Sequence, residues 1–310
     1  MRSTLRTQRP MDKDHRQPSV TTGTVAALLF VQLLFGAFPV VAKLAFPSFG
    51  AGGVSVLRIA GGAIFFQALR LLRREAPVPW REQPKFVLCA ALGIASNQLL
   101  FLYGLERTSA MHAALLVTTV PIATMAASAI LGRERLTTRR LFGMGVAGLG
   151  AALLITGRDL GGTATLLGDA MVLANAAVYG IYLVLSRDIL IRHGPLTAIA
   201  WFFTWGLPMV LPVAGWPAMA GHTREEWLAI AFIVGGPTIA TYWLNLVALR
   251  RLPASVVALF IYVQPVITAV LAVPFLGERL TLWTLLTGAM SFVGVYVATR
   301  QNPVRPGATR

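Results

Sequence analysis

The chain has 310 residues, of which 56% are hydrophobic and only 13% are charged. Soluble domains carry about 25% charged residues, so this composition excludes an ordinary soluble protein and favours a membrane protein. The net charge of +15 would suit a nucleic-acid partner, but the basic residues are distributed as in a membrane protein.

The chain begins with 23 polar, arginine-rich residues that show no hydrophobic periodicity. We therefore expect residues 1–23 to be a disordered cytoplasmic tail. A signal peptide would have a short apolar core followed by a small-residue cleavage site. The first apolar stretch is longer than such a core and ends in VAKLAFPSFG, which lacks that site, so we interpret it as a retained transmembrane helix.

Ten apolar stretches of roughly 17 to 24 residues follow, and an α-helix needs about 20 residues to cross a bilayer. The sequence therefore predicts an all-α membrane protein with ten transmembrane helices and no room for a soluble catalytic domain. The helices are expected at 24–46, 53–72, 85–105, 110–131, 139–156, 166–186, 196–214, 227–249, 254–275 and 282–299. A second tail is expected at 300–310.

Basic residues lie mainly in alternate connections between these helices. With the N-terminus inside the cell, 21 of the 27 lysines and arginines fall in cytoplasmic segments, four in outside loops, and two, Lys43 and Arg58, within helices. Basic segments resist translocation and attract the anionic inner leaflet. The pattern predicts a multi-pass protein of the cell (inner) membrane with both termini cytoplasmic, partnered by the lipid bilayer and not by nucleic acid.

The chain repeats itself at a fixed offset, since RERLT at 133–137 returns as GERLT at 277–281. The same offset aligns Glu134 with Glu278, Pro121 with Pro265, Gly36 with Gly180, and Gly150 with Gly294. It spans five predicted helices, an odd number, so the halves 24–156 and 166–299 must enter the membrane from opposite sides. Inverted repeats of this kind bind a small-molecule substrate between the halves and expose it to each side alternately, which predicts a transporter.

Longer segments also recur between the halves. The first half contains LYGLERTSAMHAALLVTTVPIATMAASAILGRERLT, and the second contains ALRRLPASVVALFIYVQPVITAVLAVPFLGERLT. A glycine-rich predicted helix follows each segment. Over about residues 24–300 this pattern resembles the EamA-type family of the drug/metabolite transporter superfamily. It departs slightly, since Arg133 separates Gly132 from Glu134. The resemblance implies export or exchange of amino acids, sugar derivatives, nucleobases or drugs. It also implies a cavity walled by the first four helices of each half, with the fifth at the periphery.

Polar and aromatic residues within the predicted helices are candidates for the cavity, because amides in hydrocarbon should face the protein interior. There they either orient a substrate in a largely apolar pocket or hold helices together. The candidates are Gln32, Asn97, Gln98, Thr118, Asn175, Tyr179, Tyr182, Trp201, Trp205, Tyr242, Tyr262 and Gln264. Arg58 joins them with two interpretations. It snorkels to the outer interface and pairs there, or it clusters with Lys43 and Asp169 at an outer vestibule and reaches inward to a substrate carboxylate.

Two features recur at matching depths in the two halves. Pro121 and Pro265 each remove a helical hydrogen bond, and the resulting kink either opens the cavity wall or serves packing alone. Glu134 and Glu278 end their helices at opposite membrane faces. We expect each carboxylate to be solvated or paired with a neighbouring arginine, with a gating role as the alternative.

None of the ten stretches has an aspartate or glutamate near its middle. Proton-driven transporters commonly use buried carboxylates or histidines, so we expect facilitated diffusion or exchange down a gradient. Asp169 and His112, near the outer ends of 166–186 and 110–131, are the candidates for proton coupling.

We expect no catalytic set, metal site or cofactor. Cys89 is the single cysteine, and no P-loop lysine motif is present. GMGVAG at 143–148 matches a dinucleotide-binding pattern but lies inside the predicted helix 139–156, where its small residues favour close helix packing instead. An intramembrane enzyme or a non-transporting subunit or sensor is a weaker alternative, and a homodimer is left open.

Overall fold

The computed structural model describes residues 22–134, 136–156, 164–244 and 260–299. Over these residues the chain is helical and contains no strand. Eight helices in the described part are long and apolar enough to cross a membrane, and α12 (Gln264–Leu276) is a shorter apolar helix. The predicted all-α, multi-pass membrane architecture is confirmed.

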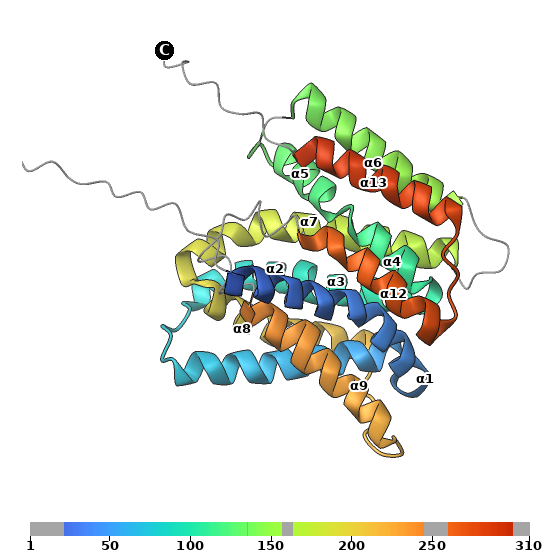
Figure 1. Cartoon of the computed structure of the whole chain (residues 1–310). Helices are drawn as coiled ribbons and strands as arrows, with labels where there is room; N and C mark the ends of the chain where they lie inside the picture. Colours follow the sequence, from blue (N-terminus) through green and yellow to red (C-terminus); the bar gives the residue numbers. More distant parts are fainter. Residues whose placement is uncertain (1–21, 135, 157–163, 245–259, 300–310) are drawn as a thin grey trace, which may run out of the picture.

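The helices follow one another in two sets, with the colours of Figure 1 marking their order. The first half contains α1 (Thr22–Leu72), α2 (Gln83–Ala90), α3 (Asn97–Arg107), α4 (Ala110–Val117), α5 (Val120–Ile130) and α6 (Thr138–Thr156). The second half contains α7 (Leu166–His193), α8 (Pro195–Ala214), α9 (Arg224–Val234), α12 and α13 (Leu282–Thr299). The helices predicted at 227–249 and 254–275 include residues 245–259, which lie outside the described residues.

α1 contains two of the predicted helices. Gly50 interrupts it with a φ of 63°, a left-handed conformation that glycine adopts without steric cost. The helical runs 22–49 and 51–72 lie on either side of this glycine, and Figure 1 shows the chain turning there. The second run begins with a backbone N–H, that of Ala51, which donates to the Glu106 carboxylate at 3.2 Å. A carboxylate at this position satisfies one of the free donors of a helix start.

Two π-helical turns occupy equivalent positions in the two halves. Ala91–Ser96 joins α2 to α3, and Gly235–Ala240 continues α9. Pro237 in the second turn cannot donate a backbone hydrogen bond, which favours a widened turn. Gly93 occupies the equivalent position in the first turn and lies against Tyr182, whose ring would overlap a Cβ placed there.

α6 and α13 pack side by side at one edge of the molecule (Figure 1). A Cβ on Gly150 would lie 2.6 Å from the Ser291 Oγ, and a Cβ on Gly294 would overlap the Ala147 backbone nitrogen. The repeat offset aligns Gly150 with Gly294 and Ala147 with Ser291, so the two contacts are equivalent. The predicted packing role of the small residues in GMGVAG is confirmed, since Gly143 and Ala147 are buried against α13.

Two hydrogen bonds between α6 and α13 are also equivalent to each other under the repeat offset. The Arg139 Nε donates to the Val297 carbonyl at 3.1 Å, and the Trp283 Nε1 donates to the Leu153 carbonyl at 3.0 Å. Position 139 corresponds to 283, and position 153 to 297. The two helices are therefore related locally by a two-fold axis.

Glycines also set the contacts between other helices of the two halves. A Cβ placed on Gly36 would lie 2.7 Å from Ile267, and a Cβ placed on Gly180 would lie 2.7 Å from Ala123. Gly62 meets Phe203, and Gly206 meets Ile59, in the same reciprocal manner. The two members of each pair are equivalent contacts under the repeat offset.

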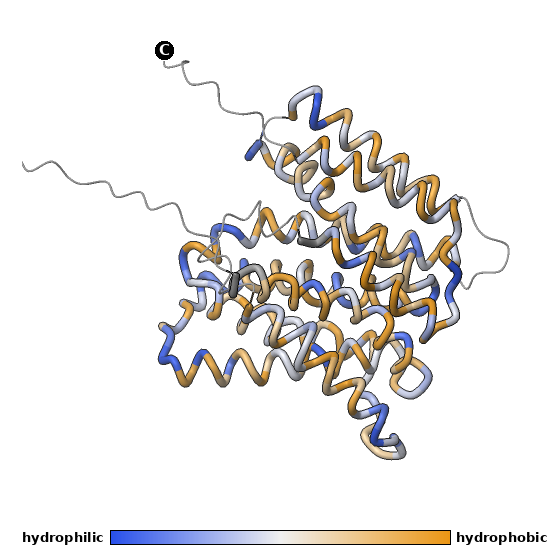
Figure 2. Tube along the Cα trace, in the orientation of Figure 1, coloured by the Kyte–Doolittle hydropathy of each residue, from blue (hydrophilic) through white to orange (hydrophobic). Residues whose placement is uncertain are grey.

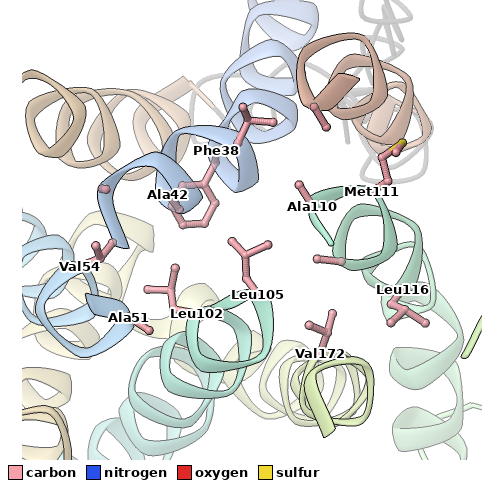
Figure 3. Packing of buried hydrophobic residues seen from close by; sticks show 14 of the residues in the cluster. Phe38, Ala42, Ala51, Val54, Leu102, Leu105, Ala110, Met111, Leu116 and Val172 are labelled. Atoms are coloured by element: carbon pink, nitrogen blue, oxygen red, sulfur yellow. The ribbon is translucent and has the colours of Figure 1, made fainter. Parts of the chain in front are cut away.

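The buried core comprises two clusters: one lies mainly between α1, α3, α4 and α7, and the other between α1, α2, α7 and α8. Figure 3 shows Phe38, Leu102 and Leu105 pointing toward one another in one of its clusters. The outward faces are also apolar, as Ile64 (73% exposed) and Val270 (66% exposed) illustrate. Figure 2 shows hydrophobic residues along the helices and hydrophilic residues mainly near their ends. This distribution suits a protein surrounded by lipid.

Replacing Gly150 with valine should separate α6 from α13, because the new side chain would overlap the Ser291 and Thr287 backbone. Overpacking of this kind costs about 1–3 kcal/mol of unfolding free energy. Thermal unfolding in detergent measures the effect. Gly148→Val is the matched control, since nothing lies within 4 Å of a Cβ at that position of the same helix. Equal melting temperatures for the two variants would contradict the close packing.

Candidate functional site

Arg58 is the centre of the polar candidate site. Its side chain is only 6% exposed, although arginine is rarely buried. Its Nε donates to the Thr238 hydroxyl at 2.7 Å, Nη1 to the Gln98 Oε1 at 2.9 Å, and Nη2 to the Pro237 carbonyl at 3.1 Å. The guanidinium therefore points into the protein, and the interpretation that it snorkels to the interface is wrong.

The groups around Arg58 come from both halves of the chain. Gln98 lies in the first turn of α3 in the first half, whereas Pro237 and Thr238 belong to the π-helical turn in the second. Phe38 of α1 places its ring 4.2 Å from the guanidinium carbon, a cation–π distance. Arg58 thus lies where the two halves meet, and its described contacts are all uncharged.

The π-helical turn explains why Thr238 can accept this hydrogen bond. Because Pro237 has no N–H, the carbonyl of Ile233 four residues earlier loses its usual helical partner. The Thr238 hydroxyl donates to that carbonyl at 3.0 Å, which leaves its oxygen lone pairs directed to Arg58. The widened turn therefore both satisfies its own backbone and presents an acceptor inside the membrane.

Several predicted cavity residues join helices of opposite halves. The Gln264 Nε2 donates to the Gln32 Oε1 at 2.7 Å, and the Asn175 Nδ2 donates to the Asn97 carbonyl at 2.7 Å. These amides are partnered within the protein, as expected for groups that hold helices together. Hydrogen bonds of this kind stabilise helix association by roughly 1 kcal/mol each.

Five of the six aromatic candidates divide into two groups. Tyr179 stacks on Tyr182 with centroids 5.5 Å apart, and Tyr242 meets Phe203 edge-on. The hydroxyls of Tyr179 and Tyr242 lie within electrostatic range of Arg58, so these two rings belong to its surroundings.

Trp201 and Trp205 form a separate group near the end of α1. They stack at 6.3 Å, Trp205 donates to the Gln83 amide at 2.8 Å, and the Arg70 guanidinium lies 5.6 Å from the Trp201 ring. Arg70 is twelve residues beyond Arg58 on the same helical run. That separation is ~18 Å along the helix, so the structure does not bring all twelve uncharged candidates into one site.

The remaining two candidates lie beside the proline positions. The Thr118 hydroxyl donates to the Leu115 carbonyl at 2.6 Å, between α4 and α5, and Tyr262 packs edge-on against Phe292. Pro121 lies in the first turn of α5, and Pro265 in the first turn of α12, so each marks a new helix start. A hinge role for these prolines stays a prediction, which normal flux in Pro121→Ala and Pro265→Ala would contradict.

Asp169 and His112 lie in contact. The Asp169 carboxylate is 1% exposed, and its Oδ2 is 3.2 Å from the His112 Nδ1. The Thr108 hydroxyl donates to the other oxygen of the same carboxylate. The alternative in which Asp169 and Arg58 cluster at an outer vestibule is therefore wrong, since the two groups have different partners among the described residues.

Glu278 caps a helix from the opposite half of the chain. Its two carboxylate oxygens accept the backbone N–H groups of Ala110 and Met111, the latter at 3.0 Å. A carboxylate at a helix start satisfies free donors and interacts favourably with the helix dipole. The expectation of a solvated or arginine-paired Glu278 is wrong, whereas Glu134 does pair with Arg140 at 2.9 Å.

A multi-pass helical protein with two copies of one motif, and buried polar groups where the copies meet, has the architecture of a membrane transporter. Residues 22–156 and 166–300 each match the EamA-like transporter family. The chain belongs to this family, and the predicted membership and transporter class are confirmed.

Two relatives illustrate the family. The chain is 28% identical over 291 residues to the probable terminal-alkyne amino-acid exporter of Streptantibioticus cattleyicolor, covering 89% of this chain and 93% of that protein. It is also 28% identical to the threonine/homoserine exporter RhtA of Salmonella typhimurium, covering 77% and 79%. A crystal structure with 21% identity superposes with a TM-score of 0.63 over 90% of this chain and 96% of that one, which supports the fold alone.

Glu278→Ala should destabilise the protein, because two backbone N–H groups at the start of α4 lose their acceptor. Loss of such a cap costs about 1–3 kcal/mol of unfolding free energy. Thermal unfolding in detergent measures it. Arg279→Ala, which changes an exposed neighbour, is the control and should leave the melting temperature unchanged. Equal melting temperatures of Glu278→Ala and Arg279→Ala would contradict the capping role.

Proposed function

We propose that this transporter exports a small amino-acid-like metabolite by alternating access between two inverted repeats of five transmembrane helices each. The repeats are 24–156 and 166–299, and the tails 1–23 and 300–310, of which the structure describes only residues 22 and 23, are cytoplasmic. The names of the relatives support export of amino acids or related compounds. Their family supports a transporter rather than an enzyme.

The observation that carries the proposal is the reciprocal contact between the halves. Gly36 of α1 meets Ile267 of α12, and the equivalent Gly180 of α7 meets the equivalent Ala123 of α5. A two-fold axis that relates the halves generates contacts of this kind. With five helices in each half, the axis lies in the membrane plane, which is the symmetry of inverted repeats.

We place the substrate between the halves, at the cluster around Arg58. The cluster combines helices from both repeats, so relative rocking of the repeats would open it to either side in turn. Tyr179, Tyr242 and Phe38 supply aromatic walls, and Gln98 and Thr238 supply polar groups. This mixture suits small-molecule sites. The pairing of α6 with α13 at one edge supports their peripheral place.

Transport is proposed to proceed by facilitated diffusion or exchange. Asp169 already accepts a hydrogen bond from Thr108 and contacts His112, and neither residue is among the hydrogen-bond partners of Arg58. Asp169 and His112 remain the candidates for proton coupling. Transport with and without a pH gradient distinguishes proton coupling from facilitated diffusion or exchange.

The purified protein in proteoliposomes tests the proposal. Vesicles preloaded with radiolabelled amino acids, sugars or nucleobases should release at least one amino acid faster than protein-free vesicles, because the protein offers a polar path through the bilayer. The release is expected without a pH gradient. Background release of every compound would contradict export. A strict requirement for a pH gradient, lost in Asp169→Asn, would instead assign proton coupling to Asp169.

A further inference from the structure

Arg58 is a buried cation without a counter-charge in the part of the chain that the structure describes. Its acceptors there are a hydroxyl, an amide oxygen and a backbone carbonyl, and none of the described ion pairs includes it. A lone charge removed from water is strongly unfavourable, and intramembrane ionisable residues usually have a partner. The missing partner is therefore an anion that is not supplied by the described side chains.

The guanidinium also has donors to spare. It carries five N–H groups, and its three bonds to described residues use one on each nitrogen. One N–H on each terminal nitrogen consequently makes no bond to a described residue. A carboxylate that binds a guanidinium in a bidentate pair accepts two N–H groups, one on each of its oxygens. Arg58 therefore has as many remaining donors as one carboxylate needs.

The surroundings favour a single negative charge. Arg58 supplies one positive charge, and the groups in contact with it, including the Phe38 ring, are uncharged. A carboxylate would neutralise the site. A doubly charged phosphate would leave an excess negative charge in the same buried position, which is costly.

We propose that Arg58 binds the carboxylate of the transported molecule, and that Gln98 and Thr238 are positioning residues that orient the guanidinium. This rests on the proposed function, and it narrows the substrates to molecules with a free carboxylate. In the empty site the Arg58 guanidinium makes hydrogen bonds only to uncharged acceptors from both halves. In the loaded site it also makes an ion pair with the substrate carboxylate. Amino acids qualify, and their carboxamides do not.

Gln98→Glu tests the proposal by replacing an amide with a carboxylate of the same shape. It places a carboxylate at the position of the Gln98 Oε1, 2.9 Å from Nη1, and so supplies the missing anion from within the protein. The variant should melt at the wild-type temperature or above, while its KM for the transported amino acid rises at least about tenfold. Arg58→Gln should raise KM by a similar factor. The probes are the twenty L-amino acids and their carboxamides, assayed in proteoliposomes.

Gln67→Glu is the matched control. Gln67 also accepts from an arginine, with Arg70 Nε at 2.8 Å, but at the other end of the same helical run. Its KM should equal that of the wild type. Wild-type KM values in both Gln98→Glu and Arg58→Gln, or equal wild-type transport of an amino acid and its carboxamide, would overturn the role of Arg58. Absence of wild-type flux for every amino acid would overturn the proposed function as well.

Discussion

Close approach at glycine is the constraint on which the rest of the structure depends. In lipid the hydrophobic effect does not drive helices together, so packing and interhelical hydrogen bonds must do so. Gly36, Gly180, Gly150 and Gly294 each allow a helix of one half to contact a helix of the other half at distances that a Cβ would prevent. These contacts come in equivalent pairs, so the packing of one half determines the packing of its partner.

The polar site follows from this arrangement. With the halves packed together, α3 of the first half and the π-helical turn after α9 of the second both provide acceptors to Arg58. The turn contains Pro237, which frees the backbone that Thr238 then satisfies. A charged group in this position is costly without an anion, and the proposed carboxylate substrate would supply that anion only in the loaded state. Under this proposal the cost of the empty site and the selectivity for carboxylates have the same origin.

The sequence predicted the parts of this protein that repeat or that depend on hydrophobic length. The apolar stretches, the repeat offset and the packing face in GMGVAG are all local or periodic patterns, and they predicted an all-helical membrane protein with two copies of one family motif. The sequence also singled out Arg58, Gln98, Asp169 and His112. It could not assign their partners, because Arg58 meets Thr238 across 180 residues and Asp169 meets His112 across 57. The cap of α4 by Glu278, 168 residues from Ala110, was hidden for the same reason. Thr238 was missed altogether, although its place beside Pro237 within an apolar helix was a usable signal.

The central claim is that the two halves lie in the membrane in opposite orientations, so that equivalent loops face opposite sides. Single cysteines at Thr137 and Arg279, in a protein whose Cys89 is replaced by alanine, place one thiol in each copy of the repeated loop. A membrane-impermeant thiol reagent added to intact cells should label the cysteine at 279 and spare the one at 137 until the membrane is opened. Labelling of both cysteines from the same side would contradict the inverted arrangement.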